Sequence, residues 1–278
     1  MAASPEPPQT GFSSGSRPAH PAASVVVTVR NEARHIADLL DSLVVQEPPF
    51  EVIVVDAMST DATPEIVERY TKRYPNFRLI RRPCLRGGGR NLGVAEAKGD
   101  VVCFIDGDCI ANPFWLQRLR QTLRTSDVAA GRTIQIGYWA FEALHRVELD
   151  HKGHDVTYPS CNLAYWKGVF DKVGGFDDGF HTAEDIDLNY RAVDVGARIA
   201  SDDEAIVYHR ARDTITKFIK QAYWNGYGRK QLTLKHGNLW GRYSFRRMLR
   251  QQASFWGVVR LASASFGYLV AKFRETRA

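Results

Sequence analysis

The sequence contains few cysteines, and none has the spacing of a zinc site. Cys84, Cys103, Cys109 and Cys161 form no C-x-x-C pair, and Cys103 lies inside an apolar run. Zinc sites and disulfide frameworks both depend on characteristic cysteine spacings. The pattern therefore predicts reduced packing cysteines in a cytosolic protein, and it argues against a zinc protein or a disulfide-rich secreted domain.

Long uncharged apolar runs are also missing. Residues 1–23 are rich in Pro, Ala, Ser and Gly and lack the apolar stretch of a secretory signal, so they are predicted to form a disordered tail. Residues 253–270 have about the minimum length of a membrane span, but Arg260 lies near their middle. A charge at that depth costs roughly 2.5–3.5 kcal/mol on insertion scales. We therefore expect a helix that lies on a membrane or packs on the rest of the protein.

Two common phosphate-binding motifs are missing as well. No G-x-G-x-x-G follows the first predicted strand, and the glycine-rich segment 86–91 is not a Walker loop. This argues against a nicotinamide dehydrogenase and a sugar-nucleotide pyrophosphorylase. The segment, which contains Arg90 and Asn91, is predicted to be a flexible basic loop that contacts phosphate through backbone N–H groups and guanidinium.

The charge is unevenly distributed along the chain. The whole chain carries a net +6, but residues 209–278 contain 15 Lys and Arg against 2 Asp and Glu, a net +13. Basic and aromatic side chains are interleaved there, which suits an anionic membrane surface or single-stranded nucleic acid. A solvated basic face over a packed aromatic core is the alternative. We expect the membrane surface and no nucleic acid, and we select Trp224, Arg229 and Lys230 as candidate contacts to an acceptor or a lipid.

Alternating strand and helix patterns predict an α/β fold with a mostly parallel, Rossmann-like sheet flanked by helices. The predicted strands are residues 24–29, 51–56, 77–81 and 101–106, and the predicted helices between them are 31–45, 63–73 with Thr63 as N-cap, and 90–97. Further on, residues 157–164 are strand-like, 199–203 and 205–208 predict a pair of short strands, and everything from Thr214 onward is predicted to be helical.

Carboxylates follow the predicted strands. Asp106-Gly107-Asp108 ends the fourth strand, and Asp56 ends the second. Buried unpaired carboxylates are costly, whereas the carboxyl edge of a parallel sheet faces the crevice where ligands bind. Oxygen ligands there can hold a divalent cation that clamps a diphosphate. The alternative for the D-x-D is an ordinary acidic turn. Asn31 and Glu32 follow the first strand, and their alternative interpretation is the N-terminal cap of a helix.

Seven short motifs occur in a specific order. They are Arg30-Asn31-Glu32, the D-x-x-S-x-D-x-T of residues 56–63, the glycine-rich Arg90-Asn91, D-x-D, the C-N-x-A of residues 161–164, the G-G-F-D of 174–177 and the E-D-x-D-L-x-x-R of 184–191. They cover roughly two-thirds of the chain. In this order they resemble the family-2 inverting glycosyltransferases of the GT-A fold, in the nucleotide-diphospho-sugar transferase superfamily.

The resemblance implies an enzyme that moves a sugar from a nucleotide-diphosphate sugar to an acceptor hydroxyl with inversion, using Mn²⁺ or Mg²⁺. It assigns Asp185 as the catalytic base, with Glu184 beside it. Asp108 matches the metal ligand and Asp106 the ribose and metal contact, and His209 is a candidate ligand, although a lone histidine is more often structural. The implied nucleotide-sugar contacts are Arg30, Asn31, Glu32, Asp56, Arg90, Asn91, Asp106, Gly107 and Asp108.

Two departures from the family pattern matter. Ala183 stands where the family often has Thr, and the Q-x-x-R-W motif of processive synthases is missing, which favours transfer of a single sugar. The alternative interpretation of Glu184 and Asp185 is that they are ordinary acidic residues at a helix N-terminus, where their charge favours the helix dipole, with Thr182 as the N-cap.

These features predict a GT-A domain over residues 24–212 and a helical, basic and aromatic region over 213–278 that associates with a membrane. We expect a cytoplasmic, peripheral protein whose acceptor is a lipid-linked or cell-surface glycan. The alternatives are a catalytically silent, membrane-docked nucleotide-sugar-binding module and, more remotely, a nucleic-acid-binding protein.

Overall fold

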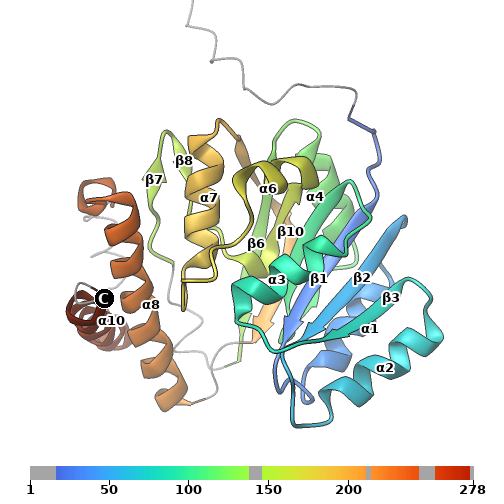
Figure 1. The fold of residues 1–278 in the computed structure, drawn as a ribbon, viewed down its shortest axis with the longest axis horizontal. Coiled ribbons are helices and arrows are strands. Elements are labelled where there is room, and N and C mark those ends of the chain that lie inside the picture. Colours follow the sequence, from blue (N-terminus) through green and yellow to red (C-terminus); the bar gives the residue numbers. More distant parts are fainter. Residues whose placement is uncertain (1–16, 138–145, 211–213, 244–253, 276–278) are drawn as a thin grey trace, which may run out of the picture.

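The computed structural model describes residues 17–137, 146–210, 214–243 and 254–275, and its central element is an eight-stranded sheet (Figure 1). The strand order is β3-β2-β1-β4-β9-β6-β10-β5. The strands are β1 (Ala23–Val29), β2 (Phe50–Asp56), β3 (Phe77–Arg81), β4 (Val101–Asp106), β5 (Cys109–Ala111), β6 (Val128–Ile136), β9 (Leu163–Trp166) and β10 (Ile199–Arg210).

The sheet is mostly parallel, which confirms the predicted fold class. β1 pairs in parallel with β2 and β4, β2 with β3, and β6 with β10. β9 runs antiparallel to both β4 and β6, and β5 antiparallel to β10. The β-branched and apolar runs of β1, β2 and β4 are buried almost throughout, as expected for strands that helices cover on both faces.

Helices lie on both faces of the sheet, with α3 and α6 in front of it in Figure 1. The helices are α1 (Ile36–Val44), α2 (Thr63–Arg73), α3 (Arg86–Ala95), α4 (Trp115–Leu123), α6 (Lys167–Val173), α7 (Glu184–Asp194), α8 (Ile215–His236) and α10 (Phe255–Glu275), with 3₁₀ turns η1 (Ser160–Asn162) and η2 (Trp240–Arg242). A two-stranded ribbon of β7 (Asp150–His151) and β8 (His154–Asp155) lies beside α7.

The glycine-rich segment is helical, so the predicted flexible loop is wrong. α3 begins at Arg86 and contains all three consecutive glycines. A methyl group on Gly89 would lie 2.6 Å from Cγ2 of Thr28, and one on Gly93 would overlap Val26. The glycines therefore let α3 pack closely on β1, which needs no side chain at these positions.

Several predicted boundaries and caps are also wrong. α1 begins at Ile36, and Asn31 adopts φ +58°, so Asn31 is not its N-cap. Thr63 is the first residue of α2, and its N–H donates to Asp61 (3.0 Å). Of the segment 157–164 that is predicted to be strand-like, residues 157–162 form a loop and the 3₁₀ turn η1, and only Leu163 and Ala164 belong to a strand, β9. The two short strands predicted after residue 199 are one strand, β10, with an irregularity between Asp202 and Ile206.

The C-terminal region packs on the α/β part through a second apolar cluster. Leu149, Val156, Ile186, Tyr190 and Leu232 belong to it, which joins α7 and α8 to the ribbon. None of the helices in the described part of the chain has the length and hydropathy needed to cross a bilayer. At the other terminus, Ala23 belongs to β1 and Arg17 pairs with Asp127 (2.5 Å). Residues 1–16 of the predicted tail lie outside the described residues.

Candidate active site

A cavity of about 1650 Å³ begins where β1 and β4 end and extends to α8 and α10. We call the part lined by the residues that follow β1 and β4, together with Arg86, Glu184, Asp185 and His209, the sheet end. The helical end is the part lined by α8, α10, Tyr243 and the lining residues of segment 146–158 (Arg146, Val147, Thr157 and Tyr158).

The sheet end brings together most of the acidic residues that the sequence singled out. Asp106 and Asp108 line it, and Asp185, from a distant part of the chain, lines the same cavity. The residue between the two aspartates, Gly107, has no room for a side chain, because a methyl group there would lie 2.7 Å from Cγ1 of Val29. The other predicted site residues in this lining are Arg30, Glu32, Glu184 and His209.

Arg90 connects the two acidic pairs from behind the cavity. Its side chain is only 2% exposed, and its Nη1 donates to Oε1 of Glu184 (2.7 Å) while its Nη2 donates to Oδ1 of Asp106 (2.8 Å). Burial acts to raise the pKa of Asp106, but the positive charges of Arg90, Arg86 and His209 outweigh it, and the pKa is lowered. One buried cation thus fixes both carboxylates and keeps Asp106 ionised.

Asp185 has the environment of a general base. Its Oδ2 accepts from the N–H of Ser160 (3.1 Å), and its Oδ1 accepts from the N–H of Ile186 (2.9 Å). Burial and the negative charge of Glu184 raise the pKa of Asp185 to about 6. A carboxylate with this pKa is ionised at neutral pH and binds a proton more strongly than an ordinary aspartate.

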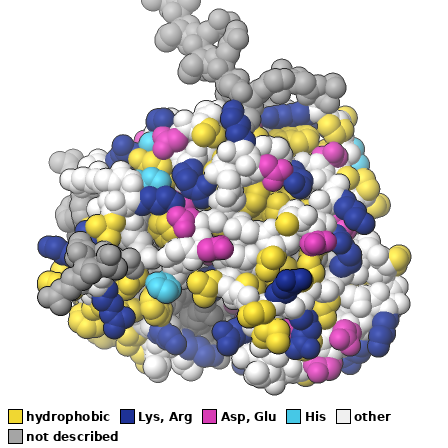
Figure 2. All heavy atoms as spheres, in the orientation of Figure 1, with side chains coloured by type: hydrophobic (Ala, Val, Ile, Leu, Met, Phe, Trp, Pro, Cys, Tyr) yellow, Lys and Arg dark blue, Asp and Glu magenta, His cyan; other side chains and the backbone are white. Residues whose placement is uncertain are grey.

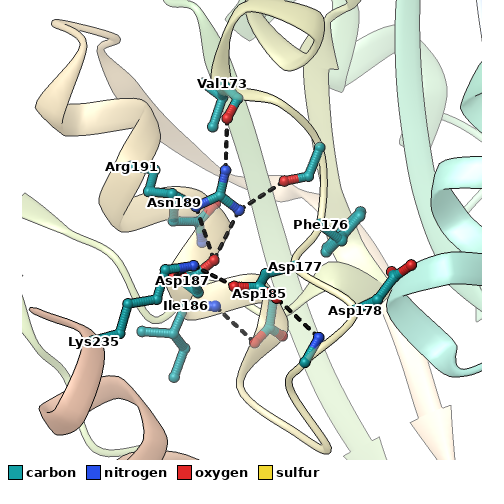
Figure 3. A network of polar contacts seen from close by, with 12 residues as sticks. Val173, Phe176, Asp177, Asp178, Asp185, Ile186, Asp187, Asn189, Arg191 and Lys235 are labelled. Atoms are coloured by element: carbon teal, nitrogen blue, oxygen red, sulfur yellow. Dashed lines mark hydrogen bonds and ion pairs between the residues drawn. The ribbon is translucent and has the colours of Figure 1, made fainter.

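A buried ionic network fixes the helix that carries Asp185 (Figure 3). Asp187, fully buried, accepts from Nε of Arg191 (2.8 Å) and Nε2 of His236 (2.8 Å) and pairs with Nζ of Lys235 (2.9 Å). Burial acts to raise the pKa of Asp187, but these hydrogen bonds and the charge of Arg191 lower it to about 2. The network therefore ties α7 to the end of α8.

The same network also holds the segment that precedes α7. Arg191 donates to the carbonyl oxygens of Val173 and Gly175, both at 2.7 Å. Ala183 adopts φ +67° directly before Glu184, and no side chain caps α7, so the predicted Thr182 cap is wrong. This backbone conformation is strained for alanine and is typically retained where the surroundings impose it, often at active sites.

A cluster of possible metal ligands lies beside Asp106. Ligand atoms of Asp108, Cys109 and His209 all lie within 4.8 Å of one another, and His209 Nε2 is 3.3 Å from Oδ1 of Asp108. Asp106, which accepts from Arg90, is outside this cluster. A carboxylate and an imidazole together suit Mn²⁺, whereas Mg²⁺ strongly prefers oxygen ligands.

Cys109 is the member of this cluster that the sequence analysis did not single out. Burial and the neighbouring Cys161 thiol raise the pKa of Cys109 well above the usual value. Because the thiolate is the form that binds metals, Cys109 is a poor ligand here. His209 differs: burial acts to lower its pKa, but the hydrogen bond to Asp108 and the nearby negative charges raise it to about 9.

Four predicted nucleotide-sugar contacts are not among the described residues that line the cavity. Asp56 is fully buried and accepts from Ser59 and from Nε of Arg81 (3.0 Å). The Oδ1 of Asn31 accepts from the N–H of Thr60 (2.8 Å). Arg90 bridges carboxylates, and Asn91 exchanges two hydrogen bonds with the backbone of Phe176. Their direct contact with a nucleotide stays a prediction.

Of the three candidates on α8, Arg229 lines the cavity. Trp224 packs on His181, with ring centroids 5.5 Å apart, and Lys230 lies 5.5 Å from the centre of the Tyr268 ring. Arg260 also lines the cavity. The sequence analysis considered Arg260 only as a charge that disfavours a membrane span. No local sequence pattern predicts that the Arg260 side chain faces the cavity.

The chain matches the family model described as glycosyl transferase family 2 over residues 24–175, more than half of its length. It is 28% identical to the glycosyltransferase AglE of Haloferax volcanii over 228 residues, which cover 76% of this chain and 74% of AglE. It is 29% identical to the pre-mycofactocin glycosyltransferase of Mycobacterium tuberculosis, covering 80% of this chain but only 49% of that protein.

Solved structures share the fold. The mannosyltransferase PcManGT of Pyrobaculum calidifontis, in complex with GDP-Man and Mn²⁺, aligns over 92% of this chain and 76% of its own, with a TM-score of 0.63 and 18% identity. Residues 1–349 of TarS from S. aureus, in complex with UDP, align over 92% of both chains, with a TM-score of 0.60 and 19% identity. With its parallel sheet and the motif order on that sheet, the chain belongs to glycosyl transferase family 2 and is a glycosyltransferase with the GT-A fold.

Proposed function

We propose that the protein transfers a single sugar from a nucleotide-diphosphate sugar to an acceptor hydroxyl, with inversion at the anomeric carbon. The observation that carries this proposal is that Asp108 and His209, whose possible ligand atoms lie within 4.8 Å of each other, line the same cavity as Asp185, a carboxylate with a raised pKa. The reaction has two chemical tasks, holding the diphosphate and removing a proton from the acceptor. Different groups perform them, and both sets of groups must face the same cavity.

The sheet end is proposed to hold the donor. Arg30 and Arg86 line it together with Glu32 and the D-x-D, and arginine recognises phosphate oxygens through paired N–H donors. The TarS and PcManGT complexes with UDP, UDP-GlcNAc and GDP-Man support a nucleotide sugar as the donor class.

Asp108 and His209 are proposed to hold the divalent cation. The Nδ1 of His209 lies 3.1 Å from the amide nitrogen of Gln135. Rotation of that amide by half a turn would let Gln135 accept from Nδ1–H, which leaves Nε2 available as a ligand. Mn²⁺ or Mg²⁺ bound there would offset the negative charge that develops on the diphosphate leaving group.

Asp185 is proposed to take the proton of the acceptor hydroxyl. The hydroxyl oxygen forms the new bond to the anomeric carbon, and the bond from that carbon to the diphosphate oxygen breaks on the opposite side, so its electron pair leaves with the nucleoside diphosphate. Arg90 holds Glu184 in place beside the base. A single displacement of this kind inverts the anomeric configuration.

We further propose that α10 binds the anionic, cytoplasmic face of a membrane and that the acceptor is a lipid-linked or cell-surface glycan. Phe255, Phe266 and Phe273 are 73%, 64% and 63% exposed and lie on one stripe of the helix. Figure 2 shows hydrophobic and Lys/Arg side chains side by side at the edge of the molecule where α8 and α10 lie. Apolar side chains flanked by basic ones match a bilayer of anionic lipid.

The test is a thermal-shift screen of nucleotide sugars with MnCl₂, followed by NMR of the product. The donor should raise the melting temperature, since a ligand of the folded state stabilises it by RT ln(1 + [L]/Kd). The product should have the opposite anomeric configuration to the donor. A retained configuration would contradict the mechanism, and donor binding without turnover across a broad acceptor panel would favour the silent binding module.

A further inference from the structure

The helical end of the cavity has a positively charged wall. The lining residues contributed by segment 146–158, α8, Tyr243 and α10 include Arg146, Arg229 and Arg260, and among these described residues none is Asp or Glu. The sheet end differs, because Glu32, Asp106 and Asp108 line it. A cavity lined by one sign of charge concentrates ligands of the opposite sign.

Arg229 is oriented by neutral groups. Its Nη1 donates to the hydroxyl of Tyr243 (3.0 Å), its Nη2 donates to the carbonyl oxygen of Val147 (3.0 Å), and its guanidinium lies 5.3 Å from the centre of the Tyr243 ring. These contacts fix the side chain at the cavity wall without cancelling its charge. Arg146 differs, since its Nη1 pairs with Oδ2 of Asp155 (2.6 Å).

Arg260 reaches the same wall from α10. The two helices pack with their backbones in close contact, because a methyl group on Gly226 would overlap the carbonyl of Ala264 and one on Gly267 would overlap that of Tyr223. Burial and the charge of Arg229 lower the pKa of Arg260 to about 10, so Arg260 stays charged at neutral pH. Arg229 and Arg260 line the same cavity.

Two guanidiniums that line one cavity can together bind an anion. Phosphate suits the pair best, because it offers three oxygens and up to two negative charges to planar guanidinium donors. Neutral polar residues also line this part of the cavity: Gln221, Asn225, Tyr243, Ser265 and Tyr268. Such groups can hydrogen-bond further phosphate oxygens.

We propose that Arg229 and Arg260 form an anion subsite that binds a phosphate group of the acceptor, so that the acceptor is a phosphate ester. This rests on the proposed function, and it places the phosphate at the helical end while the reacting hydroxyl extends along the same cavity to Asp185. Leu269 both lines the cavity and is 51% exposed on α10. A lipid chain attached to the phosphate would therefore leave the cavity next to the stripe of exposed phenylalanines.

The test is calorimetric titration of the full chain with octyl phosphate in EDTA, with octanol as the uncharged control. EDTA removes any cation from the sheet end, so that the titration reports on the helical end. The double variant Arg229→Gln/Arg260→Gln should bind octyl phosphate at least about tenfold more weakly than the wild type, as expected when charge-assisted hydrogen bonds are lost. Octanol should not distinguish the two proteins.

The matched control is Lys220→Gln/Arg274→Gln, which removes the same charge from exposed positions of α8 and α10. It should bind octyl phosphate as the wild type does. Equal loss in both double variants, or no loss in Arg229→Gln/Arg260→Gln, would overturn the subsite. If that variant is not folded by circular dichroism, Arg229→Lys/Arg260→Lys keeps the charge and should bind more weakly than wild type, because lysine lacks the paired donors.

Two further arms identify the source of the phosphate. If the wild type sediments with phosphatidylcholine vesicles containing hexadecyl phosphate and Arg229→Gln/Arg260→Gln does not, the phosphate belongs to a lipid. Arginine-dependent binding of octyl phosphate without such co-sedimentation would assign a soluble phosphate ester. These titrations need neither a donor nor turnover. The subsite can therefore be disproved while the wild type still hydrolyses a donor with Mn²⁺. Donor hydrolysis is the measurement that tests the proposed function.

Discussion

The two ends of the cavity differ in how their charges are arranged. At the sheet end, buried charges are paired, because Arg90 joins Asp106 to Glu184. At the helical end, Arg229 contacts neutral oxygens, and apolar side chains of α10 remain exposed. The sheet end therefore has its buried arginine paired with carboxylates, whereas at the helical end we propose that a bound anion pairs with Arg229.

The largest expected effect concerns the paired end. Arg90→Gln leaves two carboxylates without their buried cation, and breaking a buried pair in this way costs about 3–5 kcal/mol of unfolding free energy. Urea denaturation measures it. Lys167→Gln, which removes an exposed pair with Asp171, should cost under about 1 kcal/mol. Equal costs would show that Arg90 does not organise the sheet end.

The next prediction concerns the exposed stripe of the helical end. Phe266→Ser should weaken sedimentation with anionic vesicles about tenfold, because a phenylalanine buried in lipid contributes about 1.5–3 kcal/mol. Phe114→Ser, at a residue of equal exposure (64%) just before α4, is the control and should leave vesicle binding unchanged. Similar losses in both variants would remove α10 as the membrane contact.

A third prediction concerns the metal site. Because neighbouring negative charges raise the pKa of His209 to about 9, a cation must displace its proton at neutral pH. Mn²⁺ affinity should therefore rise about tenfold per pH unit between about pH 6 and 8. Calorimetry measures the slope, and His209→Gln should flatten it. A pH-independent affinity of the wild type would exclude His209 as a ligand.

The smallest expected effect tests whether the base lowers stability. Since the folded-state pKa of Asp185 is raised to about 6, its protonated form favours folding; that contribution is full below about pH 4 and is lost as the pH rises through 6. Asp185→Asn should therefore be more stable than the wild type at pH 8, by on the order of 1–2 kcal/mol, and not at pH 4. Asp171→Asn, an exposed control on α6, should show no such pH dependence. A gain independent of pH would contradict the raised pKa.

The sequence predicted the sheet end better than the helical end, for a physical reason. Asp106 and Asp108 follow a buried strand, and the carboxyl ends of neighbouring parallel strands meet at one edge, so their placement follows from local pattern. The bridging role of Arg90 does not follow from local pattern. It depends on how closely α3 packs on β1, which the glycines of α3 determine. Arg260 was equally unpredictable, since its direction is set by the crossing of α10 over α8.

The central claim is that Asp108 and Asp185 serve one reaction in two roles. It is tested most directly by titrating the donor found in the screen, with Mn²⁺, into Asp108→Ala and Asp185→Asn, and by measuring sugar transfer by the same samples. Asp185→Asn should bind donor as the wild type does but transfer sugar about 10²–10⁴-fold more slowly, whereas Asp108→Ala should lose Mn²⁺-dependent donor binding. Undiminished transfer by Asp185→Asn, or unchanged Mn²⁺ dependence in Asp108→Ala, would contradict it.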